Sequence, residues 1–405
     1  MGDATSELDL DEIFSPEVRR DPHPLYHALR AEQPRAYIEA DDEWILTRWA
    51  DCEAVLRDPK WSSNPEHRGD RPFNGPQIQD FAEANVRTLL FLDPPDHTRL
   101  RRLVSKAFTP RRIEQLREHV KEITEELLAD VKPGEPFDAI ATLAYPLPVI
   151  VICELMGVPV EDRHLFEGWS SDATRLLDGN IDEETLQRGI LAAMYFINYF
   201  NDLFQKRRAE PRDDLVSGLL AVEEAGDVLT EEELRSIVLL LFLAGHETTM
   251  NLIGNGLFAL MQSRDQWDRL VADRSLVPAA VEELLRYDGP VHVTGRIATE
   301  DLEVGGQLFA KGTQVVTLLA AANRDPERFP DPDRLDVGRE DNQHLTFSHG
   351  IHYCLGAALA RLEGQAVFDM LASRYPSLRL AVDADQVEYR EHFVLRGLKA
   401  LPVVV

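Results

Sequence analysis

The sequence predicts a mainly α-helical protein with a minor β portion, and two observations support this. The longest helical pattern begins after Thr230, which can form a capping box with Glu233, and it continues to about Met261. At about 1.5 Å per residue, a helix of that length would cross the whole molecule. Strand patterns, by contrast, are confined to two stretches, residues 36–47 and 292–316.

In the N-terminal part, residues 36–47 are expected to form a hairpin, because extended stretches flank a turn at Asp41–Asp42. Residues 62–80 are rich in proline, glycine and asparagine and predict a long loop. Thr109–Pro110 is typical of a helix N-terminus. Apolar residues then recur at helical spacing through Ile113–Leu127, which predicts one helix there.

In the C-terminal part, Gly305–Gly306 predicts a tight turn within the strand region. A last helix is expected to begin near Cys354 and to carry an apolar face as far as Met370. We find no internal repeat and no linker rich in glycine and serine. We therefore expect a single domain over residues 1–405, with an N-terminal tail at about residues 1–20.

The net charge is −28, which disfavours binding to nucleic acid or to anionic lipid. Acidic residues crowd the first twenty positions, which is not typical of a signal peptide. The longest apolar run, Ile237–Ala244, is much shorter than the about 20 residues that a membrane helix needs. These features predict a cytoplasmic protein that binds neither nucleic acid nor membrane.

The charge is unevenly distributed, because residues 97–112 contain basic side chains and no acid. The basic residues are Arg99, Arg101, Arg102, Lys106, Arg111 and Arg112. A solvated helix face would explain them. The alternative is a docking surface for an acidic partner protein.

Cys354 is set apart from the other two cysteines, Cys52 and Cys153, which lie among apolar neighbours. It lies at an expected helix start, where free N–H groups favour a thiolate. Gly350 permits a turn with positive φ, and Gly356 permits close approach of the backbone to a large group. Phe347 would shield the sulfur.

Three alternatives remain open for this segment. His344, His349 and His352 together with Cys354 could form a zinc site. Cys354 could instead be a nucleophile at a helix terminus, or a purely structural cysteine.

The pattern Phe347-x-x-Gly350-x-x-x-Cys354-x-Gly356 resembles the haem-binding signature of the cytochrome P-450 family, with Ser348 where glycine is usual. The resemblance extends from about Asp21 to the C-terminus. It implies haem b (iron protoporphyrin IX), with Cys354 as the iron ligand and Phe347, Gly350 and Gly356 beside the haem. It also implies one large triangular fold, with the haem between the long central helix and the helix that follows the cysteine loop.

Glu283 and Arg286 resemble the Glu-x-x-Arg motif of the same family. At this spacing the two side chains share a helix face. The family uses the pair as a buried structural brace for the cysteine loop, usually with a further arginine. Arg339 and Arg328 are both candidates for that position.

Residues 244–249 resemble the oxygen-activating motif of the family. The resemblance assigns the catalytic alcohol to Thr248 and the catalytic acid to Glu247, and places Ala244 and Gly245 beside the haem. A glycine followed by threonine can also open the helical hydrogen-bond ladder. Alternatively, Gly245 only packs against another helix. His246 occupies a variable position and is expected to face substrate or solvent.

Four basic residues match positions at which the family binds the haem propionates. They are His97, Arg101, Arg296 and His352. Arginine and histidine are suitable hydrogen-bond donors for carboxylates.

The resemblance implies a mono-oxygenase that activates O2 and hydroxylates or epoxidises a lipophilic small molecule, such as a polyketide, a macrolide or a steroid-like compound. Electrons would come from an acidic ferredoxin and its reductase, docked at the basic residues. The alternative function is a haem-binding sensor or carrier without turnover. The expected substrate pocket includes Leu240, Leu241, Val291, Val293, Thr294 and Val394, within segments that also include residues 62–90, 168–196 and 393–395.

Residues 254–259 fit the glycine pattern of dinucleotide-binding turns. That turn must directly follow a strand. Here the pattern lies inside the long helical stretch, so we expect no nicotinamide site.

Overall fold

A computed structural model describes Val18 and residues 20–39, 41–69, 88–177, 182–224, 227–392 and 394–405. The predicted N-terminal tail and much of the predicted long loop at 62–80 lie outside these residues.

The mainly α prediction is confirmed. The helices are α2 His23–Glu32, α3 Trp49–Arg57, α5 Asp96–Ala107, α6 Pro110–Gln115, α7 Arg117–Leu127, α8 Pro146–Met156, α9 Arg163–Thr174, α10 Glu183–Ala209, α11 Leu215–Ala221, α12 Glu231–Gln262, α13 Arg264–Ala272, α14 Val277–Asp288, α15 Leu319–Ala322 and α16 Ala357–Arg374. The strands are β1 Arg35–Ile38, β2 Glu43–Leu46, β3 Trp61–Ser62, β4 Phe137–Asp138, β5 Glu223–Glu224, β6 Asp227–Val228, β7 Val293–Ala298, β8 Leu302–Val304, β9 Gln307–Phe309, β10 Gln314–Leu318, β11 Arg379–Leu380 and β12 Pro402–Val404.

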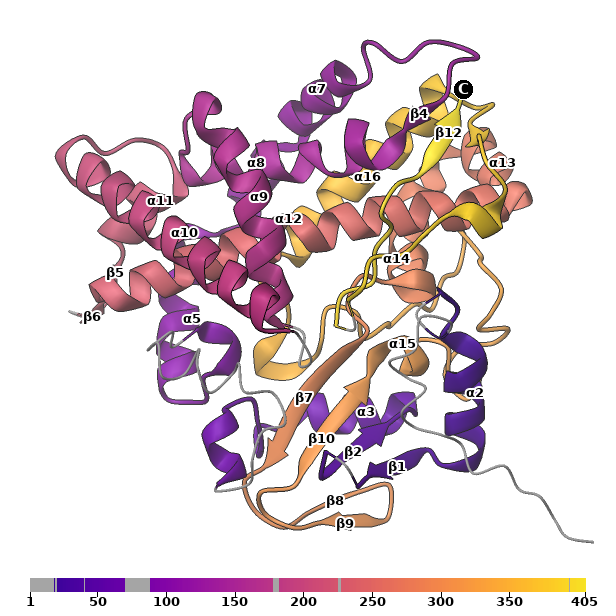
Figure 1. The fold of residues 1–405 in the computed structure, drawn as a ribbon. Coiled ribbons are helices and arrows are strands. Elements are labelled where there is room, and N and C mark those ends of the chain that lie inside the picture. The colour runs from indigo at the N-terminus through magenta and orange to yellow at the C-terminus, as the bar shows by residue number, and fades with distance from the viewer. Residues whose placement is uncertain are drawn as a thin grey trace, which may run out of the picture.

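The central helix α12 crosses the helical part of the molecule (Figure 1). Its predicted capping box is present: the Thr230 hydroxyl accepts from the Glu233 N–H at 3.2 Å, and the Glu233 carboxylate accepts from the Thr230 N–H at 2.8 Å. Within the described residues, α12 alone is long and apolar enough to cross a bilayer. However, 67% of its most apolar window is buried inside the protein. Such burial is typical of a core helix packed inside a protein.

The dinucleotide-like glycines lie inside α12, as expected, and they serve helix packing. A Cβ atom on Gly256 would lie 2.9 Å from both Leu284 of α14 and Phe368 of α16. A Cβ atom on Gly254 would lie 2.6 Å from Ile140. The pattern therefore lets three helices approach closely and forms no nucleotide-binding turn.

The main sheet has the strand order β1-β2-β10-β7-β3 and lies below the helices in Figure 1. The predicted hairpin is formed by β1 and β2, with Tyr37 opposite Trp44. A second hairpin joins β8 to β9 through Gly305 and Gly306, which both have the predicted positive φ. β7 lies inside the sheet and carries Arg296 opposite Val315 of β10.

Two helix boundaries differ from the predictions. The helix expected over Ile113–Leu127 is divided into α6 and α7 at Leu116, whose N–H donates to the Ile113 carbonyl at 3.0 Å. This i to i−3 bond tightens the last turn of α6 and redirects the chain. The helix after the cysteine loop begins at Ala357, with Gly356 as its N-cap.

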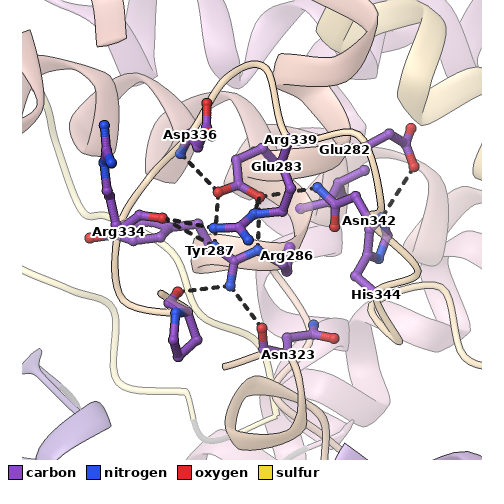
Figure 2. A network of polar contacts seen from close by, with 12 residues as sticks. Glu282, Glu283, Arg286, Tyr287, Asn323, Arg334, Asp336, Arg339, Asn342 and His344 are labelled. Carbon is purple, nitrogen blue, oxygen red and sulfur yellow. Dashed lines mark hydrogen bonds and ion pairs between the residues drawn. The ribbon is translucent and has the colours of Figure 1, made fainter. Parts of the chain in front are cut away.

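A buried polar network fixes α14 to the segment before the cysteine loop (Figure 2). Arg286 donates two hydrogen bonds of 2.8 Å to the Glu283 carboxylate, and both side chains are completely buried. Of the two candidate arginines, Arg339 contacts Glu283, at 3.0 Å. Arg328 instead pairs with the exposed Asp341.

Asn323 connects this network to the cysteine loop. Its carbonyl accepts from Arg286 at 2.9 Å, and its side-chain amide donates to the Thr346 hydroxyl at 2.9 Å. Its side-chain oxygen accepts from the Leu345 N–H at 2.7 Å. The two residues directly before Phe347 are therefore held by a partner of Arg286.

We predict that Glu283→Gln lowers the free energy of unfolding by about 3–5 kcal/mol, because Arg286 and Arg339 would keep buried charges without a counter-charge. The matched control is Arg328→Gln, which removes an ion pair with an exposed partner and should cost about 0–1 kcal/mol. Urea denaturation followed by circular dichroism measures both. Equal losses in the two variants would contradict a bracing role for Glu283.

Candidate active site

The cysteine loop is shaped by two residues with left-handed backbone conformation. Gly350 has φ +67°, and a Cβ atom there would lie 2.5 Å from the Leu56 carbonyl oxygen at the end of α3. Ser348 has φ +61° although it is not glycine, which costs about 1–2 kcal/mol. The loop closes with the Cys354 N–H donating to the Phe347 carbonyl at 2.9 Å. The serine therefore keeps the turn that a glycine would otherwise form.

The Cys354 sulfur faces a space inside the protein. The side chain is accessible, yet burial is the largest influence on its pKa, so protein atoms surround it. Gly356 borders the same space, because a Cβ atom there would meet only the Cys354 sulfur, at 3.9 Å. An accessible thiol deep in a protein, beside a glycine with free room, suits the approach of a large planar group.

The N–H groups at the start of the following helix lower the pKa of the Cys354 thiol, as expected, but they are not the largest influence on it. Burial raises the pKa of the thiol. The N–H groups of Gly356 and Ala357 donate to the sulfur and, with the cations of Arg101 and Arg361, lower the pKa. Since burial outweighs these contributions, the helix terminus alone does not produce a thiolate. A metal cation bonded to the sulfur would.

Phe347 and its neighbours form one face of the loop. The Arg361 guanidinium lies 4.5 Å from the centre of the Phe347 ring and donates to Glu282 at 2.6 and 2.9 Å. It also donates to the Tyr353 hydroxyl at 3.1 Å. Arg361 was not among the predicted site residues. Its signal in the sequence is its position seven residues after Cys354, about one turn into the helix that begins at Ala357.

The zinc alternative does not fit, because the three histidines point to different partners. His344 binds the Glu282 carboxylate at 3.2 Å, and His349 accepts from the Gly350 N–H at 2.8 Å. Within the described ranges, no group of three histidine, cysteine, aspartate or glutamate side chains could hold a metal ion.

The four predicted propionate-binding residues converge from three elements. His97 of α5 and His352 of the cysteine loop have ring centres 4.4 Å apart. Arg101 of α5 donates to the Tyr353 carbonyl at 2.6 Å. Arg296 of β7 is buried, and among the described residues it donates to Thr294 and Gly295 of its own strand. The structure therefore gathers four basic side chains beside the cysteine loop.

Within the described residues, no carboxylate forms an ion pair with this basic cluster. Both ring nitrogens of His97 and the Nε2 atom of His352 are buried without a hydrogen-bond partner in the described part of the chain. Burial, followed by Arg296, His97 and Arg101, lowers the pKa of His352 to about 3. Burial lowers the pKa of His97 and lowers that of Arg296 to about 10, and Asp93 opposes this only in part because its own oxygens bind Ser62 and Ser63. Unpaired buried donors are costly. The carboxylates of a haem group would satisfy them.

The central helix presents one accessible strip to the interior. Ala244 is exposed and Thr248 is partly exposed, although α12 is otherwise largely buried at this level. The Thr248 hydroxyl donates to the Ala244 carbonyl at 2.7 Å. The helix α12 continues without interruption from Glu231 to Gln262, through Gly245 and Thr248. A Cβ atom on Gly245 would lie 3.2 Å from Ile152, so Gly245 also serves helix packing.

Glu247 and His246 point away from this strip. The Glu247 side chain is buried, and one of its oxygens accepts from Arg390 at 3.3 Å. The His246 ring lies between Phe242 and Tyr145, and its Nδ1 atom binds the Phe242 carbonyl at 3.0 Å. Burial lowers the pKa of His246. The expectation that His246 faces substrate or solvent is therefore wrong: the histidine belongs to an aromatic cluster in the core.

The residues expected in the substrate pocket fall into two groups. Val293 and Val394 pack in one cluster around β7 and β10, with Thr294 next along β7. Leu240 and Leu241 lie partly buried on α12, and Val291 packs against the cluster beside β2 and α3. Residues 70–87, 178–181 and 393, which belong to the predicted pocket segments, lie outside the described residues.

Comparisons with known proteins agree with this geometry. A family model described as cytochrome P-450 matches residues 181–376. Vitamin D(3) 25-hydroxylase of Pseudonocardia autotrophica is 42% identical over 100% of this chain and 99% of its own length. The 6-deoxyerythronolide B hydroxylase of Saccharopolyspora erythraea is 40% identical over 93% of this chain and 94% of its own. The solved structure of the cytochrome P-450 of the bacillaene polyketide synthase of Bacillus subtilis 168 is 38% identical, with a TM-score of 0.88, and covers 97% of this chain and 98% of that chain. The chain therefore belongs to the cytochrome P-450 family of mono-oxygenases, whose cofactor is haem.

Proposed function

We propose that this mono-oxygenase hydroxylates or epoxidises a lipophilic small molecule of the polyketide, macrolide or steroid-like class. The observation that carries the proposal is the accessible Cys354 sulfur inside the protein, together with the accessible strip of Ala244 and Thr248 on the central helix. In such an arrangement Cys354 would hold the cofactor, and Ala244 and Thr248 would line the space open to the reacting groups.

The substrate class is supported by the residues expected around the site. Leu240, Leu241, Val291, Val293 and Val394 are apolar, and Thr294 adds a single hydroxyl. Pockets of this composition favour lipophilic ligands with few polar groups. Two relatives are named as hydroxylases of vitamin D(3) and 6-deoxyerythronolide B, and a related structure belongs to a polyketide synthase. These names agree with the proposed class.

The protein's own residues would hold and orient the reacting groups. Haem, when bound, supplies the iron at which O2 is activated. Cys354 would hold that iron, and the basic cluster of His97, Arg101, Arg296 and His352 would hold the propionates. Thr248 donates its only hydroxyl proton to Ala244. Its oxygen lone pairs are therefore left to accept a hydrogen bond from a group in the interior space. Glu247 would supply protons to this position.

We predict that Thr248→Ala continues to consume reductant but releases a larger share of it as hydrogen peroxide. The reason is that the hydroxyl oxygen that orients proton delivery is removed while the cofactor site is unchanged. The product formed should fall by roughly 10²-fold, within the range typical of a lost general acid–base contribution. The measurement is product and peroxide per reductant consumed. Thr249→Ala is the control, since its hydroxyl donates to Gly245 and the residue is buried. Unchanged coupling in Thr248→Ala would contradict the assigned role, and a carrier without turnover would consume no reductant when ligand is added.

We also propose that an acidic ferredoxin delivers electrons near α5. The basic surface is narrower than the sequence suggested, because Arg99 binds Asp227 at 3.1 Å and also Glu233, and Arg112 binds Asp213 at 3.0 Å. The side chains of Arg102, Lys106 and Arg111 are exposed and form this basic surface. They lie on α5 and α6, and the α5 residue Arg101 contacts the cysteine loop. A partner at this surface would approach the sulfur side of the site.

We predict that Arg102→Glu slows reduction by an acidic ferredoxin roughly tenfold at low ionic strength, because favourable steering becomes repulsion. The difference should shrink as salt is added. Arg379→Glu makes the same charge change on β11, in the sheet with β12 and β4. Stopped-flow reduction measures all three proteins, and equal rates in the two variants would argue against docking at α5.

We also propose that the protein lies in the cytoplasm. All three cysteines are free, and Cys52 and Cys153 are buried. Unpaired thiols are typical of a reducing compartment, where a soluble electron donor would also be available.

A further inference from the structure

Glu247, the acid of the proposed oxygen-activating pair, has an unusual position for a group that must exchange protons. It is buried, and it lies next to Thr248 on α12, so the two side chains point about 100° apart around the helix axis. Oε1 accepts from Arg390, whereas Oε2 has no partner in the described part of the chain. A buried carboxylate with one unpaired oxygen is costly unless its other contacts are strong.

Arg390 belongs to the C-terminal hairpin, in which Tyr389 pairs with Leu398. The Arg390 N–H donates to the Gly397 carbonyl at 2.8 Å, and its Nε atom donates to the Leu398 carbonyl at 3.2 Å. The guanidinium is therefore fixed by the backbone of its own hairpin. Among the described residues, the guanidinium also donates to Glu247 and to the Met250 sulfur, both on α12.

The hairpin itself is fitted closely to α12. A Cβ atom on Gly397 would lie 1.9 Å from the Asn251 side chain, so this position requires glycine. Asn255 donates to the Arg396 carbonyl at 3.0 Å. Further along, the Val394 carbonyl accepts from the His292 N–H at 3.0 Å, beside β7. One short hairpin therefore contacts the acid at its base and reaches the expected substrate pocket at its tip.

The two side chains of this ion pair differ in their exposure to solvent. The Glu247 side chain is 3% exposed, whereas the Arg390 side chain is 25% exposed. Arg390 is thus the polar group through which the buried acid meets the surface of the protein. His246, the other titratable neighbour of Glu247, faces the aromatic core and offers no such route.

We propose that Arg390 is a positioning residue for proton delivery: it holds Glu247 in place and forms the polar connection between this buried acid and solvent. The inference rests on the proposed function of Glu247 and Thr248, and it adds a residue from a distant segment to that machinery. Because the hairpin that carries Arg390 also carries Val394, the acid is positioned by the same element that borders the substrate.

The test compares Arg390→Gln, Arg390→Lys and the control Lys399→Gln in the haem-loaded enzyme. Lys399 pairs with Glu388 at 3.2 Å on the same hairpin, and within the described residues its side chain makes no ion pair with α12. Arg390→Gln should lower product formation roughly tenfold, raise the peroxide share and increase the solvent deuterium isotope effect. Arg390→Lys should recover most of the loss because it keeps the cation, and Lys399→Gln should behave as the wild type. Equal effects of Arg390→Gln and Lys399→Gln would overturn the proposal.

A second measurement does not depend on turnover. If the pair is a unit, the denaturation midpoint should fall in Arg390→Gln but should not fall further when Arg390→Gln is added to Glu247→Gln. Additive shifts would show that the two residues act separately and would overturn the inference. A failure of the proposed function is distinguishable, because Thr248→Ala would then leave coupling unchanged whatever the outcome of this cycle.

Discussion

The constraint on which this structure depends is that one cysteine sulfur must stay accessible in the middle of a packed protein. Isolated thiols in such places are normally covered by side chains, as Cys52 and Cys153 are. Cys354 is kept open because its loop is held from several sides. Gly350 passes closely over the end of α3, Asn323 holds the residues before Phe347, and α16 begins directly after the sulfur. The buried Glu283 carboxylate, with its arginine partners, fixes that scaffold.

The electrostatics of the site complement a group that is both cationic and anionic. Burial raises the pKa of the Cys354 thiol, so the sulfur needs a bonded cation to be ionised. The basic cluster needs anions, because buried nitrogens of His97 and His352 lack partners in the described residues. Haem would supply both an iron cation and two carboxylates in one molecule. The two unmet requirements of the protein are therefore met by a single cofactor, in a chain whose net charge is otherwise strongly negative.

Local features of the fold could be predicted from the sequence, and features that depend on tertiary contacts could not. The capping box at Thr230 and the glycine turn at Gly305–Gly306 are set by neighbours in the chain, and both are present. The choice of Arg339 over Arg328 depends on how distant loops fold, and both lie at plausible spacings. The partner of Glu247 is 143 residues away, so no pattern near the motif could indicate Arg390.

The sequence-based predictions that differ from the structure also have physical reasons. His246 was expected to face substrate or solvent because it occupies a variable position of the motif, but on α12 its ring packs against Phe242 and Tyr145. The basic surface was overestimated because Arg99 and Arg112 find acids on segments more than one hundred residues away. Helical spacing predicted one helix through Leu116, whereas the chain forms two helices there, α6 and α7, which both contact α16. In each case, contacts with distant parts of the chain decided a feature that the neighbouring residues alone did not indicate.

The central claim is that the Cys354 sulfur binds the haem iron, and the absorption spectrum of the reduced, CO-bound protein tests it most directly. The wild type and Cys153→Ala, which alters a buried cysteine of α8, should both show the band characteristic of thiolate-ligated haem with CO. Cys354→Ala should lose that band. A Cys354→Ala protein that still shows it would contradict the account, because another residue would then be the ligand.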